Sequence, residues 1–215
     1  MVTSRWVPAA RAGALPILLA LAFAPGLAGC GGPAEGTRDV SSVLGPWLAQ
    51  PLASIDRTLA AAAERVCRTS ASPVRGDAVA VLHDQRGMGI DTAIFVGPSG
   101  PEWCQVLSDK TGLVRWQGGA SSGQPTQPIL PPVAIVIDSW GSSSSEAGGS
   151  RSDVSEIDGR VVDGVERVTI VLADGASVSA SVAGGWFYAW WPSKVAPTSV
   201  VAAGAAGQPL GTATP

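Results

Sequence analysis

Short runs of β-forming residues, separated by polar and turn-forming residues, dominate the chain after residue 77. Runs rich in β-branched and aromatic residues and bounded by Gly, Pro and Asp-Gly pairs are typical of strands. They predict strands at 77–83, 89–96, 102–107, 113–116, 133–138, 154–162, 165–172, 176–182 and 186–191. The pairs Asp163-Gly164 and Asp174-Gly175 indicate hairpin turns, because glycine accepts the positive φ that such turns require.

One segment has the periodicity of a helix. From Pro51 to Cys67 apolar residues recur three and four positions apart, at Leu52, Ile55, Leu59, Ala63 and Val66. The predicted fold class is therefore mainly β with one N-terminal helix (α+β). We expect a helix on a small antiparallel sheet over 41–117, followed by a small β-sandwich or roll over 133–192.

Stretches rich in Ser, Gly and Pro interrupt the strand pattern. Residues 118–132 predict a linker between the two domains, and residues 141–150 predict a long mobile loop within the second. Residues 193–215 indicate only a weak hairpin and a disordered tail.

The first thirty residues follow a different pattern. Arg5 and Arg11 precede an apolar run over 15–23, and small residues follow near Gly26. This is the layout of a signal peptide, which we expect over residues 1–29. The apolar run is too short to cross a bilayer core of about 30 Å as a permanent helix.

The leader ends in Leu27-Ala28-Gly29-Cys30, which resembles the lipobox of bacterial lipoproteins. The resemblance implies cleavage before Cys30 and acylation of that cysteine, for instance with palmitate. It also implies a lipid anchor on the extracytoplasmic face of the cell membrane. Residues 30–40 would then be the lipidated cysteine and a flexible tether. The alternative is a secreted protein in which Cys30 is incidental.

The net charge argues against one class of partner, nucleic acid, and the cysteines predict a disulfide. Removing the leader takes away Arg5 and Arg11, which leaves 12 basic and 17 acidic residues and a net charge of −5. Such a chain has no basic surface for nucleic acid. Cys67 and Cys104 remain as an even pair in an oxidising compartment, which predicts a disulfide. A reactive thiol pair is the alternative, without the Cys-x-x-Cys spacing that would support it.

A C-terminal pattern resembles uncharacterised exported actinobacterial proteins. It comprises Gly159-Arg160-Val161-Val162, residues 168–175, Gly185-Trp186-Phe187 and Trp190-Trp191-Pro192. The resemblance implies a shared β module and no particular activity. An Ala-, Gly- and Arg-rich composition is in keeping with a GC-rich genome.

The aromatic strand within this pattern carries the candidate binding residues. Trp186, Tyr188 and Trp190 would lie on one face, and Phe187, Ala189 and Trp191 on the other, because strand side chains alternate. One face can fill the core, and the first trio could form a platform for sugar rings or an apolar partner. The alternative is that these side chains join two sheets.

Other motifs are weak. Ser121 lies in a Gly-x-Ser-x-Gly match, but the prolines that follow prevent the helix that a nucleophile elbow needs. His83 is the single histidine and precedes Asp84. Asp153, Glu156 and Asp158 lack the spacing of a calcium loop and indicate a solvated acidic edge or a loose surface site. We predict no catalytic residue, no metal site and no cofactor.

The sequence thus predicts a lipid-anchored, non-catalytic binding or interaction module of the cell envelope, with a glycan or protein partner. One alternative is an envelope-acting hydrolase that uses His83 and an unidentified serine. The other is a structural spacer, which would leave the aromatic strand wholly buried and no pocket anywhere.

Overall fold

The computed structural model describes residues 47–70, 74–87, 90–109, 112–120, 129, 132–147 and 150–215. The leader, Cys30, the predicted tether and Ser121 lie outside the described residues. Over the described residues the chain forms one helix and twelve strands, arranged in three four-stranded sheets with antiparallel pairing. The predicted fold class, mainly β with a single helix, is confirmed.

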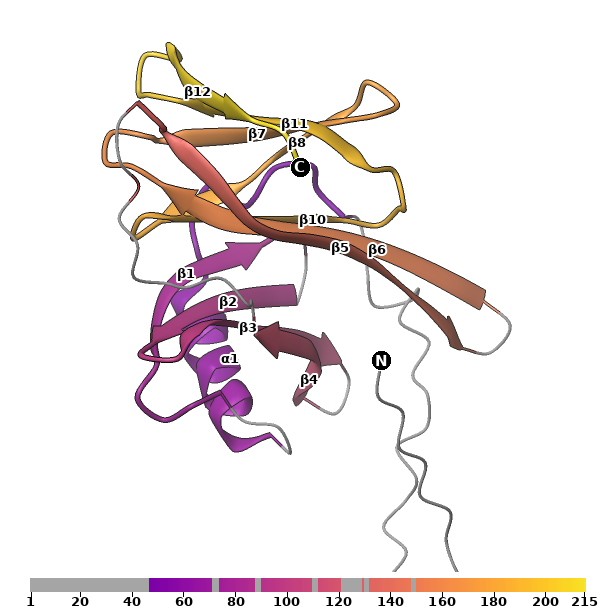
Figure 1. The fold of residues 1–215 in the computed structure, drawn as a ribbon. Coiled ribbons are helices and arrows are strands. Elements are labelled where there is room, and N and C mark those ends of the chain that lie inside the picture. Colours follow the sequence, from indigo (N-terminus) through magenta and orange to yellow (C-terminus); the bar gives the residue numbers. More distant parts are fainter. Residues whose placement is uncertain are drawn as a thin grey trace, which may run out of the picture. The chain divides into compact units, whose positions relative to one another are not determined.

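The first sheet is a meander in which each strand pairs with the next. Its strands are β1 (Val79–Gln85), β2 (Ile90–Gly97), β3 (Gly100–Asp109) and β4 (Gly112–Ala120). They lie at the four positions that the runs of β-forming residues predicted, except that β4 continues to Ala120, three residues into the predicted linker 118–132. The helix α1 (Arg57–Thr69) covers one face of this sheet (Figure 1).

The helix begins six residues later than its apolar spacing predicted. Asp56 caps it, because the Asp56 carboxylate accepts hydrogen bonds from the backbone N–H of Thr58 and Leu59 at 2.9 and 3.1 Å. The Gln85 side chain in turn bonds both the N–H and the C=O of Asp56. The chain before Asp56 is thereby held against β1 in a non-helical path.

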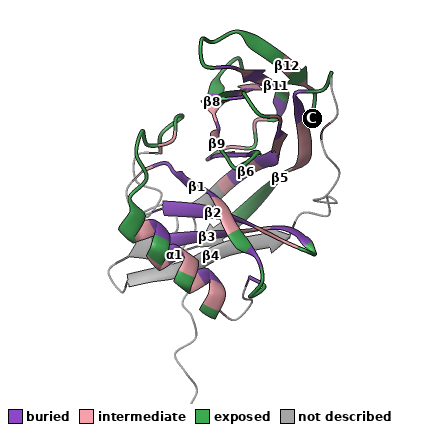
Figure 2. Ribbon diagram, turned by 90° about the vertical axis from the view of Figure 1, so that its left-hand side faces the viewer, coloured by how far each residue is buried: buried purple, intermediate pink, exposed green. Residues whose placement is uncertain are grey.

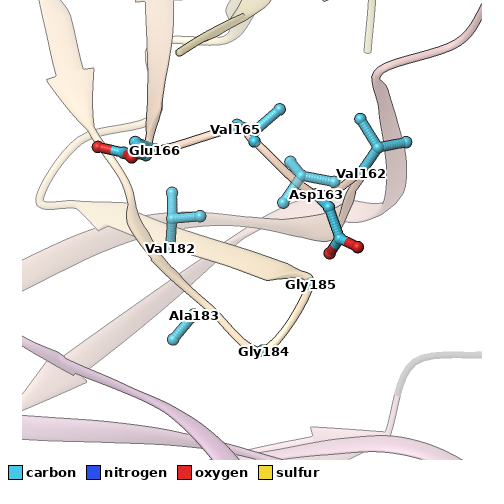
Figure 3. Close-up of a pocket in the computed structure, with 10 residues that line it drawn as sticks. Val162, Asp163, Val165, Glu166, Val182, Ala183, Gly184 and Gly185 are labelled. Atoms are coloured by element: carbon cyan, nitrogen blue, oxygen red, sulfur yellow. The ribbon is translucent and has the colours of Figure 1, made fainter. Parts of the chain in front are cut away.

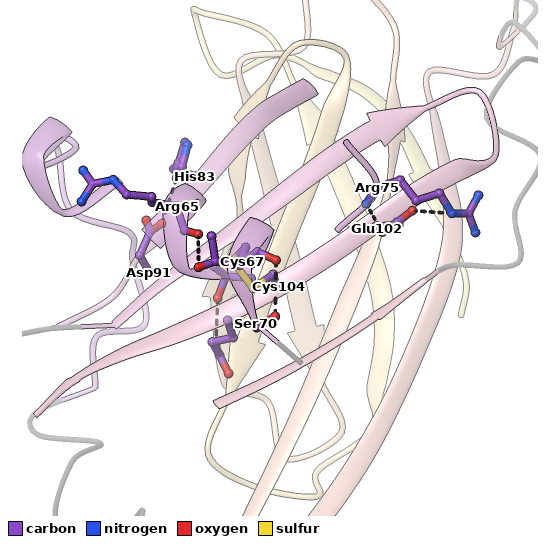
Figure 4. The surroundings of a disulfide bond; sticks show 11 residues. Arg65, Cys67, Ser70, Arg75, His83, Asp91, Glu102 and Cys104 are labelled. Carbon is purple, nitrogen blue, oxygen red and sulfur yellow. Dashed lines mark hydrogen bonds and ion pairs between the residues drawn. A yellow bond between two sulfur atoms is a disulfide. The ribbon is translucent and has the colours of Figure 1, made fainter. Parts of the chain in front are cut away.

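The predicted disulfide is present and joins α1 to β3 (Figure 4). Cys67 and Cys104 have an S–S distance of 2.04 Å and a Cα–Cα distance of 6.0 Å, and both are fully buried. They sit in a small core between helix and sheet with Ala63, Phe95 and Val106. The helix presents small residues to this core, which lets it lie close to the sheet.

The second and third sheets together form the predicted sandwich. The second has the order β5 (Ile135–Ala147), β6 (Ser150–Val161), β10 (Trp186–Trp191) and β9 (Ser181–Ala183). The third has the order β12 (Pro209–Ala213), β11 (Pro197–Ala203), β7 (Arg167–Leu172) and β8 (Ser177–Ser179). The strand predicted at 176–182 is divided at Ala180, since β8 pairs with β7 and β9 pairs with β10.

Two segments predicted to be irregular are strands. Residues 141–147 and 150 of the predicted loop belong to the far part of the β5–β6 hairpin, where pairing continues from Ser142–Ser155 to Ala147–Ser150. Its serines accept strand geometry because the partner strand satisfies their backbone groups. The weak hairpin predicted within 193–215 is present as β11 and β12, and β12 continues to Ala213 into the end that was predicted to be disordered.

The second sheet lies in the middle of the three (Figure 1). One of its faces packs on the third sheet through a core that includes Ile157, Phe187, Trp191, Ile170 and Val200. Its other face packs on the first sheet through a core that includes Leu82, Ile94, Val154, Tyr188 and Trp190. The two predicted halves of the chain are thus in contact, within one compact unit that spans Thr37–Pro215.

Candidate functional site

The aromatic strand β10 has the two faces that alternation predicted, but neither is exposed. Trp186, Tyr188 and Trp190 lie in the core toward the first sheet, at 6, 0 and 0 % exposure. The predicted exposed platform is therefore corrected, because the first sheet covers it. These side chains join two sheets, the alternative considered above. The rings of Trp47 and Trp190 pack edge to face, with their centroids 6.3 Å apart. The Nε1 of Trp47 donates a hydrogen bond to the Trp190 carbonyl at 3.2 Å.

His83 lies between two carboxylates on the helix side of the first sheet (Figure 4). Its Nδ1 is 2.9 Å from Asp91 on β2, and its Nε2 is 3.3 Å from Glu64 on α1. Burial works to lower the pKa of His83, yet the hydrogen bond and charge of Asp91 and the charge of Glu64 raise it above its ordinary value. Both ring nitrogens therefore face carboxylates, and His83 ties the helix to the sheet.

A buried ion pair joins the first sheet to the other two. Arg86 donates to both carboxylate oxygens of Asp84 at 2.8–3.0 Å, and both side chains are fully buried. The Ser181 hydroxyl donates to Asp84 at 2.8 Å. Arg86 also donates to the carbonyls of Ser179, at 2.5 Å, and Ala49, at 3.2 Å. One guanidinium thus connects β1, β8 and the chain that precedes the helix.

Two carboxyl groups on β6 face the first sheet beside Tyr188. The register places Glu156 opposite Trp190 and Asp158 opposite Tyr188. The Tyr188 hydroxyl donates to Glu156 at 3.3 Å, and the Ser139 hydroxyl donates to Asp158. Burial raises the pKa of Glu156 to about 7 and that of Asp158 to about 6, because these hydroxyls compensate only part of the lost hydration.

A third carboxylate in this region is paired with a cation. Arg160 donates two hydrogen bonds of 2.8 Å to Asp138 across the β5–β6 hairpin. This bidentate pairing directs the guanidinium to Asp138. Glu156 and Asp158 therefore form a pair that titrates near neutral pH, a property that sequence spacing alone does not reveal.

The residues of the weak calcium pattern do not converge. Asp153 differs in parity from Glu156 and Asp158 along β6, so it lies on the opposite face of the strand. There it contacts Ser144 at 2.6 Å and Lys194 at 3.8 Å. Within the described ranges, no group of three or more metal-ligating side chains has a metal-binding arrangement.

A shallow cavity of about 320 Å³ lies between two hairpin turns (Figure 3). The β6–β7 turn contributes Asp163, Val165 and Glu166, and the β9–β10 turn contributes Val182 and Gly184. In Figure 3 the two carboxylates point in different directions. The cavity thus lacks the convergent polar groups of a built ligand site.

Sequence reasoning missed an exposed aromatic side chain, Trp140. It is 45 % exposed on β5, opposite Ile157. Beyond Trp140 the β5–β6 hairpin extends past the end of β10. On the same face lie three residues of the hairpin, Ser142, Ser144 and Asp153. Lys194, from the β10–β11 connection, contacts Asp153 there. We call these five residues the ribbon surface. The available signal was a single tryptophan beside a serine-rich run.

Among the described residues no helix is long and apolar enough to span a membrane. Comparisons of the chain with protein-family models, with curated proteins and with solved structures found no match.

Proposed function

We propose that this chain is a lipid-anchored, extracytoplasmic protein that acts as a non-catalytic interaction module of the cell envelope. The basic n-region, the apolar run and a lipobox-like Leu27-Ala28-Gly29-Cys30 support the anchor. The exposed ribbon surface supports the interaction role, since it replaces the buried aromatic strand as the candidate contact.

The anchor is tested in cells that express the full chain and are fed an alkyne analogue of palmitate. We expect the wild type to incorporate the label and to fractionate with membranes. Cys30→Ala should lose the label and leave the membrane fraction, because the acylated thioether cannot form. Thr37→Ala, in the predicted tether, is the control and should behave as the wild type. Equal labelling of the Cys30→Ala chain would refute the anchor.

The ribbon surface has the chemistry of a glycan contact. An indole ring stacks on the apolar face of a sugar, and nearby hydroxyl, carboxylate and ammonium groups can bond its hydroxyls. Trp140 provides the ring, while Asp153 and Lys194 lie 3.8 Å apart on the same face. The single observation that carries the binding role is this exposed indole, with polar side chains further along the same face of the hairpin.

Titration of residues 31–215 with cell-envelope glycan fragments, followed by tryptophan fluorescence, tests the ribbon surface. We expect a saturable change and an affinity that falls about tenfold or more in Trp140→Ala, since a stacked ring contributes about 1 kcal/mol beyond its buried area. Val133→Ala removes a comparably exposed apolar side chain elsewhere and should bind normally. Unchanged affinity in Trp140→Ala would exclude this surface as the glycan contact.

A structural spacer is the second candidate, and the complete burial of β10 favours it. It predicts no saturable ligand in the same titration. The hydrolase alternative would require a serine hydroxyl at His83, whose hydrogen-bond partners in the described part of the chain are Asp91 and Glu64.

A further inference from the structure

The ten residues before the helix, 47–56, cross the surface of the domain in a fixed path. We call them the strap. The Ala49 carbonyl accepts from the Ser179 N–H at 2.8 Å, and the Leu52 N–H donates to the Gln85 carbonyl at 2.8 Å. The Trp47 indole and Asp56 fix its two ends against Trp190 and Gln85. The strap therefore has a defined backbone and defined outward-facing side chains.

Three of those outward-facing side chains are large and apolar. Leu48, Leu52 and Ile55 are 41, 41 and 45 % exposed. Among the described residues seven large apolar side chains are exposed, and these three fall within eight consecutive positions. Single exposed leucines are ordinary on protein surfaces, whereas a concentration on one fixed segment indicates a contact surface. Figure 2 shows exposed chain at this place, leading into α1.

The strap is also the first described part of the domain after the proposed anchor. Sixteen residues separate Cys30 from Trp47. A chain of that length extends at most about 60 Å. If lipid holds Cys30 at the bilayer, it holds the strap within that distance of the same bilayer. The bilayer is then a surface that stays within reach of the strap.

We propose that the strap is a membrane-contact surface, in which Leu48, Leu52 and Ile55 enter the interfacial region of the bilayer that carries the anchor. This inference rests on the proposed lipid anchor. The strap ends in Asp56 and is followed by Arg57, so its local charges offset one another. Its attraction to lipid therefore comes from apolar burial and depends little on headgroup charge or salt.

The test uses residues 31–215, which lack the leader and the lipidated cysteine, so its result is independent of acylation. The protein is sedimented with vesicles of phosphatidylcholine and, separately, with vesicles that also contain phosphatidylglycerol. We expect binding to both, retained at high salt. The variant Leu48→Ser/Leu52→Ser/Ile55→Ser should lose about tenfold in vesicle partitioning, since three partly buried aliphatic groups account for that factor.

The matched control replaces three exposed apolar residues outside the strap, as Val79→Ser/Val133→Ser/Leu210→Ser. It should partition as the wild type does, and circular dichroism should show that all three proteins are folded. The proposal is overturned if the wild type does not bind vesicles, if the strap variant binds equally well, or if the control loses as much. Failure of palmitate labelling with intact strap binding would remove the anchor and leave the strap's lipid affinity standing.

Discussion

Replacing Arg86 with methionine is expected to lower the free energy of unfolding of residues 31–215 by about 3–5 kcal/mol, because removing one partner of a buried ion pair leaves an uncompensated charge. Arg86 and Asp84 are both fully buried and share two or more short hydrogen bonds. Methionine fills a similar volume, so the loss reports the missing charge rather than a cavity. Urea denaturation at neutral pH measures it.

Two further variants separate this effect from general loss of packing. Asp84→Asn/Arg86→Met removes both charges, and we expect it to recover part of the stability that Arg86→Met loses. Arg65→Met, at an exposed position of α1, should change the free energy of unfolding by less than about 0.5 kcal/mol. If Arg86→Met were as stable as the wild type, the Arg86–Asp84 ion pair would not stabilise the contact between β1 and β8.

Alternation along the strands could be predicted, because it depends only on the pleat. The two faces of β10 are those that the order of its aromatic residues indicates: Trp186, Tyr188 and Trp190 face one core, and Phe187 and Trp191 face another. The face with Trp186, Tyr188 and Trp190 is covered by strands β1, β2 and β3 of the first sheet, which lie more than 75 residues earlier in the chain. Sequence pattern carries little information on such nonlocal packing, so the sequence left open whether the first trio forms a platform or joins two sheets.

The errors in the predicted start of the helix and in the predicted loop also have physical causes. Leu52 and Ile55 continue the helical spacing of α1, yet the Asp56 cap and its Gln85 partner stop the helix short of them. The serine run of β5 has the composition of a loop, but a neighbouring strand can satisfy its backbone groups. In both places a hydrogen-bond partner in a strand overrides a local preference.

The titratable groups of the candidate site were also only partly predictable from the sequence. The i, i+2 spacing of Glu156 and Asp158 within a predicted strand places them on one face, which sequence alone establishes. Their desolvation follows from packing against the first sheet and could not be foreseen. The same holds for His83, whose partners come from β2 and α1.

Between about pH 4 and pH 7 the free energy of unfolding is expected to fall as the pH rises, because Glu156 and Asp158 bind protons more tightly in the folded chain than in the unfolded one. Their pKa values are about 7 and about 6, against ordinary values of 4.5 and 3.8. For an acid whose folded pKa is raised, the stabilising contribution is complete below the unfolded pKa. It is lost as the pH rises through the folded pKa.

The size of this loss follows from the shifts. Each of these two rises in pKa corresponds to about 3 kcal/mol. The raised pKa of His83 acts in the same direction, since its protonated form is bound by two carboxylates. Urea unfolding at pH 5 and at pH 8 is therefore expected to give the greater free energy of unfolding at pH 5.

Glu156→Gln isolates the contribution of one carboxyl group. Glutamine keeps an oxygen that can accept the Tyr188 hydrogen bond but cannot ionise, so the variant should match the wild type near pH 4 and exceed its stability by about 3 kcal/mol at pH 8. Glu166→Gln removes the same charge at an exposed turn and should leave the pH profile unchanged. A Glu156→Gln profile parallel to that of the wild type would mean that Glu156 is ionised in the folded protein at little cost. The contact between the first and second sheets would then tolerate a charge that its burial argues against.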